Sequence, residues 1–328
     1  MKAVVYEEYG SPDILELREV ETPTPAAGQV RVRVEATTVT LVDCEFRAGN
    51  PVVARLYTGL TRPKRTVLGT EFAGQVEAIG PGVTRFRVGD RIFGASDEGF
   101  GTHAEYVCLS EQGAVTTLPD AMSMAQGAGM SNGALTALPF LRDHANVRPG
   151  DEVLIIGASG SIGTVAVQLA KELGAHVTGV CSTANVELVK SLRADRVVDY
   201  TAQDFTRGDQ RYDVVFDTVG KSSFASSKRV LKPSGAYLTT VLTAGALFMT
   251  LWTKLLGGKR AIFAPTGLRS AADKAADLEY LKGLVEAGRL RVVIDSRYPL
   301  SEIAKAHRYV GSGRKKGNLI IDIEHRAA

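Results

Sequence analysis

The sequence contains few of the residues that build metal centres and disulfide frameworks. Its 328 residues include three cysteines, Cys44, Cys108 and Cys181. They lie far apart and form no Cys-x-x-Cys or Cys-x-x-His spacing, which excludes a disulfide scaffold and a zinc ribbon. Separate reduced thiols are typical of a cytosolic protein, so we expect a cytoplasmic location.

Long uncharged apolar runs are also missing. The most apolar stretch, residues 241–258, carries Lys254 and is shorter than the roughly 20 apolar residues that a membrane span needs. Residues 1–10 enter a strand-like pattern directly, without the apolar core of a signal peptide. We therefore expect no membrane partner. We interpret residues 241–258 as a buried or lid-like helix that shapes an apolar pocket for a small hydrophobic acceptor.

No dense cluster of one charge stands out. The chain has 39 basic and 36 acidic side chains, a net charge of +3, and the run Arg314-Lys315-Lys316 is too short for a nucleic-acid surface. We interpret this run as a solvated turn and expect no nucleic-acid partner. A chain of this length should form about two domains of roughly 100–200 residues.

The first part of the chain is rich in short strand candidates that Gly and Pro pairs separate. Examples are residues 30–36 (VRVRVEA), 74–80 (GQVEAIG) and 104–109 (AEYVCL). This alternation predicts a small antiparallel barrel or a partly open sheet. Residues 292–323 return to the same style, and we expect them to close this first domain.

From residue 151 onward, apolar strands alternate with amphipathic helices. Strands are expected at 176–182, 196–200, 212–220, 236–241 and 260–265, with helices at 162–173 and 184–192. Such alternation predicts an α/β fold, with a parallel sheet covered by helices on both faces. We assign residues 1–122 and 267–328 to the β-rich domain, and residues 123–266 to the α/β domain.

A glycine-rich turn joins the first strand of the α/β region to its helix. The turn reads GASGSIG, and its glycines are Gly157, Gly160 and Gly163. Glycines let backbone approach a pyrophosphate, and the helix N-terminus offers unpaired N–H groups and partial positive charge. The strand before and the helix after make a dinucleotide site the preferred interpretation over a purely steric turn. The candidate cofactor residues here are Gly157, Ser159, Gly160, Ser161, Ile162 and Gly163.

The end of the next strand indicates which dinucleotide is bound. NAD sites usually place Asp or Glu there to bind the ribose 2′-hydroxyl, whereas this chain has Ser182, Thr183 and Asn185. Hydroxyls and an amide can bind a 2′-phosphate, although no Arg or Lys is present. We therefore expect NADP(H), with NAD(H) as the alternative. Tyr200 is a further candidate for contact with the adenosine end.

Several runs together resemble the medium-chain dehydrogenase/reductase superfamily. They include residues 39–49 (VTLVDCEFRAG), 68–94, 103–107 (HAEYV), 132–138 (NGALTAL), 147–163 and 212–220 (YDVVFDTVG), in the order that the family has them. Within it, the chain is similar to the zinc-independent quinone oxidoreductase branch. The resemblance implies a GroES-like β-rich catalytic domain, a Rossmann domain with a doubly wound parallel sheet, and an active site in the cleft between them. It also implies a homodimer, formed through an edge strand near residues 260–265.

The same resemblance bears on zinc. Zinc-dependent members use a Cys, a His and a second Cys as catalytic ligands, and this chain carries Thr40, Thr70 and Met130 or Ser131 at the matching positions. Catalytic zinc takes three strong protein ligands, mainly imidazole and thiolate, so we expect no metal. Glu71, which follows Thr70, is then interpreted as a structural carboxylate that accepts backbone N–H groups or pairs with an arginine.

Without a Lewis acid, reduction of an activated acceptor is easier than oxidation of an alcohol. The resemblance places Thr136 near the nicotinamide, Thr40 where related reductases carry Asn, and Asn132 as a donor near the acceptor. Asp43 and Arg47 match a family pattern and are interpreted as a pair that orders a loop, with Asp43 exposed. His103 and His307 are interpreted as structural.

The leading hypothesis is therefore an NADPH-dependent reductase of quinones or α,β-unsaturated carbonyls. An NAD(P)-dependent alcohol dehydrogenase or carbonyl reductase is the second, and a non-catalytic NADPH-binding regulatory protein is the third.

Overall fold

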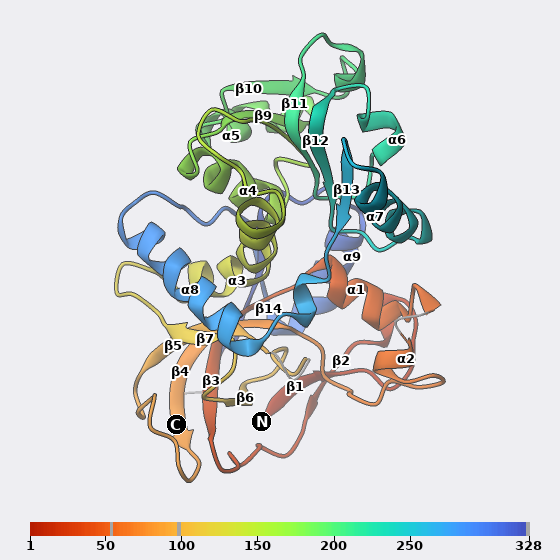
Figure 1. Ribbon diagram of the computed structural model, residues 1–328. Helices are drawn as coiled ribbons and strands as arrows, with labels where there is room; N and C mark the ends of the chain where they lie inside the picture. The colour runs from red at the N-terminus through yellow and green to blue at the C-terminus, as the bar shows by residue number, and fades with distance from the viewer. Residues whose placement is uncertain (53–54, 97–99, 326–328) are drawn as a thin grey trace. The chain divides into compact units, whose positions relative to one another are not determined.

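The computed structural model describes residues 1–52, 55–96 and 100–325, and the chain forms two compact units. The first contains Met1–Asn132, Ser270–Glu286 and Val292–Ala328, and the second contains Gly133–Arg269 and Ala287–Arg291. In Figure 1 the first unit runs from red to yellow and returns in blue, while the second is green to cyan.

The first unit is built on antiparallel strands, as the alternating pattern predicts. A seven-stranded sheet has the order β14-β15-β3-β4-β5-β7, and its seventh strand, β6, pairs with residues 29–33 of β3. The strands are β3 (Gln29–Thr38), β4 (Glu71–Ile79), β5 (Arg91–Ala95), β6 (Tyr106–Ser110), β7 (Val115–Thr117), β14 (Ile294–Pro299) and β15 (Asn318–Asp322). A two-stranded sheet joins β1 (Lys2–Val5) to β2 (Glu16–Glu19).

The C-terminal strand β15 returns to the N-terminal strand β3. Ile320 lies opposite Thr38, and the ladder is antiparallel. Alternate side chains of β3, such as Val30, Val32 and Val34, are fully buried and meet Leu319 of β15 in one core cluster. The expectation that the C-terminal residues close the first domain is therefore confirmed.

Among the described residues, four α-helices belong to this unit, and a fifth continues into the second unit. They are α1 (Leu41–Ala48), α2 (Arg55–Thr58), α8 (Ala271–Glu286) and α9 (Ile303–Gly311), while α3 (Met124–Pro139) begins in the first unit and ends in the second.

The second unit contains a six-stranded parallel sheet with the order β10-β9-β8-β11-β12-β13. The strands are β8 (Glu152–Ile156), β9 (His176–Cys181), β10 (Arg196–Asp199), β11 (Tyr212–Asp217), β12 (Leu231–Thr239) and β13 (Arg260–Phe263). In sequence order this is the 3-2-1-4-5-6 arrangement of a doubly wound dinucleotide-binding sheet. The helices are α4 (Ser161–Glu172), α5 (Val186–Ser191), α6 (Phe224–Ser227) and α7 (Ala244–Leu256). The expected α/β fold is confirmed.

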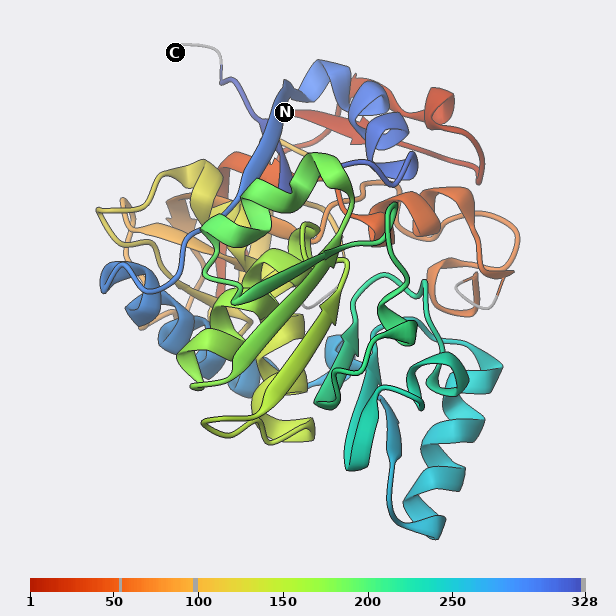
Figure 2. The same cartoon turned by 90° about the horizontal axis from the view of Figure 1, so that it is seen from above.

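Helix α7 differs from the expectation for residues 241–258. It lies beside the outermost strand β13 (Figures 1 and 2), and Leu251 and Leu255 are 67% and 84% exposed. Of the two interpretations, a buried or a lid-like helix, the buried one was wrong, because an apolar sequence does not show which of its faces a neighbour covers. Among the described residues, no helix is long and apolar enough to cross a bilayer.

The inner side of α7 covers the outer edge of β13. The backbone N–H of Ala261 donates to Thr253 Oγ1 (2.9 Å), and that of Phe263 donates to Thr250 Oγ1 (3.0 Å). A covered edge cannot extend into a second sheet without displacing these hydroxyls. A homodimer stays a prediction, but the structure does not favour the expected route through this strand.

Candidate functional site

The turn between β8 and α4 can hold a phosphate. Gly157 has a positive φ of 78°, and a Cβ on Gly163 would lie 2.0 Å from the Gly157 carbonyl oxygen, so both positions require glycine. A Cβ on Gly160 would meet its nearest atom at 3.4 Å, so the space above the turn is open. Gly160 is the N-cap of α4, and no side chain caps the helix. A glycine N-cap supplies no side-chain oxygen to the first turn of α4, and the positive end of the helix favours an anion there.

Three candidate cofactor side chains lie together beside this turn. Asn185 Nδ2 donates to Ser159 Oγ (3.0 Å) and to Ser182 Oγ (3.3 Å). Residues from the first turn and from the end of the second strand thus share one polar cluster, as a dinucleotide site in this fold requires.

A carboxylate that the sequence analysis missed lies next to this cluster. Asp199, at the end of β10, accepts a hydrogen bond from Thr183 Oγ1 (2.6 Å), and such bonds hold its pKa below the usual range. The absence of a carboxylate after β9 was therefore an incomplete argument for NADP(H). Parallel pairing places Asp199 opposite Cys181, which no local pattern reveals. Tyr200 follows with a 62% exposed side chain, and its N–H donates to the Cys181 carbonyl.

Glu71 is the centre of a buried polar network in the first unit. Its side chain accepts hydrogen bonds from the Thr38 hydroxyl and from the backbone N–H of Asn132. Burial raises the pKa of Glu71 to about 7. These bonds link β3, β4 and α3 through the carboxylate. It accepts a backbone N–H, as expected, whereas no arginine pairs with it among the described residues.

Thr40 caps helix α1. Its hydroxyl accepts from the Asp43 N–H (3.2 Å) and its own N–H donates to Asp43 Oδ2 (2.8 Å), which forms a capping box. The Thr40 hydroxyl also donates to Asp43 Oδ2 (2.6 Å). Asp43 is fully buried and also accepts from the Gly69 N–H (3.2 Å), so the interpretation of Asp43 as exposed was wrong. Among the described contacts its partners are Thr40 and Gly69, and Nε and Nη1 of the buried Arg47 have no partner. The expected Asp43–Arg47 pair is therefore absent there.

His103 and His307 are both buried in the interior of the first unit. His103 Nε2 donates to the Thr38 carbonyl (2.8 Å), His307 Nδ1 lies 3.5 Å from Cys44 Sγ, and the rings meet edge to face at 5.9 Å. Burial lowers the pKa of both histidines and raises that of the Cys44 thiol to about 12. Neutral rings and a protonated thiol suit packing, in agreement with the structural interpretation.

The remaining predicted positions divide between the units. Asn132 is half-buried on α3, near Glu71, whereas Thr136 is buried one turn later, in the second unit. Met130 and Ser131 are fully buried. Among the described residues, no group of three or more His, Cys, Asp and Glu side chains could hold a metal ion.

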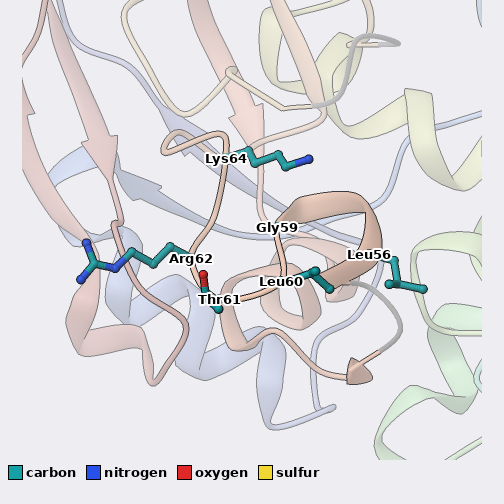
Figure 3. Close-up of a pocket in the computed structure, with 6 residues that line it drawn as sticks. All are labelled: Leu56, Gly59, Leu60, Thr61, Arg62 and Lys64. Atoms are coloured by element: carbon teal, nitrogen blue, oxygen red, sulfur yellow. The ribbon is translucent and has the colours of Figure 1, made fainter.

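Two features of the first unit escaped the sequence analysis. Lys315 is half-buried and donates to the Gly317 carbonyl (2.6 Å), so it does not belong to a fully solvated turn. A hollow of about 400 Å³ is lined by Leu56, Gly59, Leu60, Thr61, Arg62 and Lys64. Figure 3 shows Arg62 directed away from the other labelled side chains. The only sequence signal was the basic residues after Thr61.

Two family models match the chain. "Alcohol dehydrogenase GroES-like domain" covers residues 26–120, and "Zinc-binding dehydrogenase" covers residues 192–321. These matches and the fold define an oxidoreductase of the medium-chain dehydrogenase/reductase class.

Similar proteins narrow this class. The chain is 31% identical over 332 residues to a quinone oxidoreductase of Pseudomonas aeruginosa, covering 98% of this chain and 99% of the relative. It is 30% identical to a 2-methylene-furan-3-one reductase of Solanum lycopersicum, covering 98% and 79%. The quinone oxidoreductase structure from Coxiella burnetii superposes with a TM-score of 0.86, at 31% identity and 99% coverage of both chains. The chain belongs to the medium-chain dehydrogenase/reductase superfamily, in its quinone oxidoreductase-like branch.

Proposed function

We propose that this enzyme uses NADPH to reduce quinones or α,β-unsaturated carbonyl compounds without a metal ion. One observation carries the proposal: the dinucleotide turn is complete, while the positions that match zinc ligands are Thr40, Thr70 and Met130 or Ser131. The relatives are named for reduction of a quinone and of an enone, which supports this acceptor class. We keep residues 1–122 and 267–328 as the catalytic domain, residues 123–266 as the cofactor domain, and a cytoplasmic location.

The chain's own groups fit a nicotinamide dinucleotide. The uncapped N-terminus of α4, with Ser161, Ile162 and Gly163 in its first turn, suits the pyrophosphate. The cluster of Ser159, Ser182 and Asn185 suits the adenosine ribose. Thr183 and Tyr200 complete this end of the site in the proposal.

When bound, the cofactor supplies a hydride to a carbon atom of the acceptor. Negative charge then grows on the acceptor oxygen, and the Asn132 amide and the Thr40 hydroxyl are the donors that we propose for it. Thr40 must turn its hydroxyl away from Asp43 to donate, so Asn132 should contribute more. Thr136 is proposed to orient the carboxamide of the cofactor.

The direct test is oxidation of NADPH by purified, chelator-treated protein with 9,10-phenanthrenequinone, an enone, a simple ketone and an alcohol couple. We expect turnover of the quinone or enone that the chelator does not change. Asn132→Ala should lower kcat by about 100-fold, because one oxyanion donor is lost while the backbone bond to Glu71 remains. Activity only on ketones or alcohols, abolished by chelation, would contradict the proposal.

The cofactor preference has its own variant. Asp199 holds the Thr183 hydroxyl, and its negative charge opposes a 2′-phosphate placed there. Asp199→Asn should therefore improve kcat/KM for NADPH relative to NADH by roughly fivefold at low ionic strength. Thr201, which bonds to the same carboxylate, offers a control, since Thr201→Val changes the hydrogen bonding without changing the charge. If Asp199→Asn left the ratio of kcat/KM for NADPH and NADH unchanged, the 2′-phosphate would not bind near Asp199.

A further inference from the structure

Helix α7 presents a continuous apolar face to solvent. Its exposed large side chains are Leu247, Phe248, Leu251, Trp252 and Leu255. This spacing of four, three and one residues places them on one side of the helix. The rings of Phe248 and Trp252 stack within this face, at 5.7 Å between their centroids.

The opposite face of α7 fixes the helix orientation. Thr250 and Thr253 accept N–H bonds from β13, and Met249 packs against the core of the second unit. Rotation of α7 to bury Leu251 or Leu255 would break these contacts. These contacts therefore direct the apolar face away from β13. Figure 2 shows the helix beside this strand.

The sequence on both sides of α7 carries charge of one sign, although Lys232 pairs with Asp213 and Arg269 with Asp143 in the structure. Residues 218–272 contain no Asp or Glu and eight basic residues, in a chain whose total charge is +3. These are Lys221, Lys228, Arg229, Lys232, Lys254, Lys259, Arg260 and Arg269. Lys254 lies on α7 and is exposed, and Lys259 and Arg260 follow directly after it. The small net charge of the whole chain does not reveal this local excess of basic residues.

We propose that α7 binds the surface of a lipid bilayer that contains anionic lipids. A helix of 13 residues is about 20 Å long, too short to cross the roughly 30 Å hydrocarbon core. Aromatic and leucine side chains on one face, with basic residues beside them, suit a helix that lies in the plane of the interface. A second copy would bring two basic surfaces together, so the charge favours an anionic lipid surface as the occupant.

The position of tryptophan makes the test specific. Trp252 is the only tryptophan in the chain and lies on the apolar face. The full-length protein should sediment with vesicles of phosphatidylcholine and phosphatidylglycerol in equal parts, and more weakly with phosphatidylcholine alone. Binding should shift the tryptophan emission to shorter wavelength, protect it from acrylamide, and weaken as salt is added.

Two matched variants separate this face from general effects of charge. Leu255→Glu should weaken vesicle binding by at least about tenfold, because it removes an inserted leucine and adds a repelled charge. Val88→Glu adds the same charge at a 61% exposed apolar residue of the first unit and should bind like the unchanged protein. Both positions are exposed, and circular dichroism checks that both variants fold.

Three results would overturn the proposal. The first is no binding to the mixed vesicles at low salt, or equal binding by Leu255→Glu. The second is vesicle binding without a change in tryptophan emission, which would assign binding to another surface. The third is a lipid-free, concentration-dependent emission shift together with a dimer in light scattering that Leu255→Glu dissociates, which would assign the face to a second copy.

Discussion

A carboxylic acid buried without a cation must lose its charge or receive strong hydrogen bonds. Both apply to Glu71. It accepts hydrogen bonds from the Thr38 hydroxyl and the Asn132 N–H, and burial raises its pKa to about 7. Its protonation therefore changes close to neutral pH, and the stability of the first unit depends on it.

The expected pH dependence has a definite sign. Below the ordinary pKa of 4.5, Glu71 is protonated in both the folded and the unfolded chain, so it contributes no dependence. Between 4.5 and about 7 only the folded chain holds the proton, so stability falls as pH rises, by about 3 kcal/mol in total.

Glu71→Gln should remove this fall. Hydrogen exchange of the β4 amides reports the opening free energy of the first unit by itself. The opening free energy of the native chain minus that of the variant should decline across this window. A difference that stays constant with pH would show that Glu71 is charged throughout.

At the scale of elements, the β8–α4 turn combines a steric requirement with a binding one, and the two can be separated. Gly163 is closed on one side by the Gly157 carbonyl, whereas Gly160 faces open space and has an ordinary φ of −79°. Gly163 is thus required by the fold, and Gly160 leaves room for the proposed ligand.

Alanine at each position should give a different result. Gly163→Ala should lower the stability of the second unit by about 1–3 kcal/mol, because its Cβ would overlap backbone. Gly160→Ala should leave the unfolding transition nearly unchanged but weaken NADPH binding by about tenfold or more, since its Cβ enters the phosphate space. Thermal unfolding and fluorescence titration with NADPH check both. Undiminished NADPH affinity in Gly160→Ala would show that the turn does not bind the pyrophosphate.

At the scale of the whole molecule, the response to acid depends on the neutral histidines inside the first unit. His103 and His307 are fully buried, and burial lowers the pKa of each below the ordinary 6.5. Below pH 6.5 the unfolded chain therefore binds protons that the folded chain does not, so stability falls as pH falls.

The fall should reach about 1.4 kcal/mol per pH unit for each histidine. It opposes the effect of Glu71, so it is best measured in the Glu71→Gln background, again by hydrogen exchange of β4. His307→Gln should reduce the slope by about half, because one of two buried proton acceptors is removed. An unchanged slope would mean that His307 carries its proton in the folded state.

Local periodicity was sufficient for many elements of the fold, although no helix was predicted at α8 (Ala271–Glu286). The helix expected at 162–173 is α4 (Ser161–Glu172), and the strand expected at 196–200 is β10 (Arg196–Asp199). The glycine turn was visible because its residues are contiguous, and the steric demands on Gly157 and Gly163 arise within that turn. The absence of zinc ligands could also be predicted from the sequence, because the residues at the positions that match them are threonine, methionine and serine.

Only the tertiary structure brought together residues that lie far apart in the chain. Asn132 meets Glu71, and Asp199 meets Thr183, through sheet pairing and helix placement that no local pattern encodes. The outward direction of Leu255 on α7 was decided by the threonine contacts with β13 on the other side of the helix. Composition shows that a segment is apolar, but burial depends on which other part of the chain covers it.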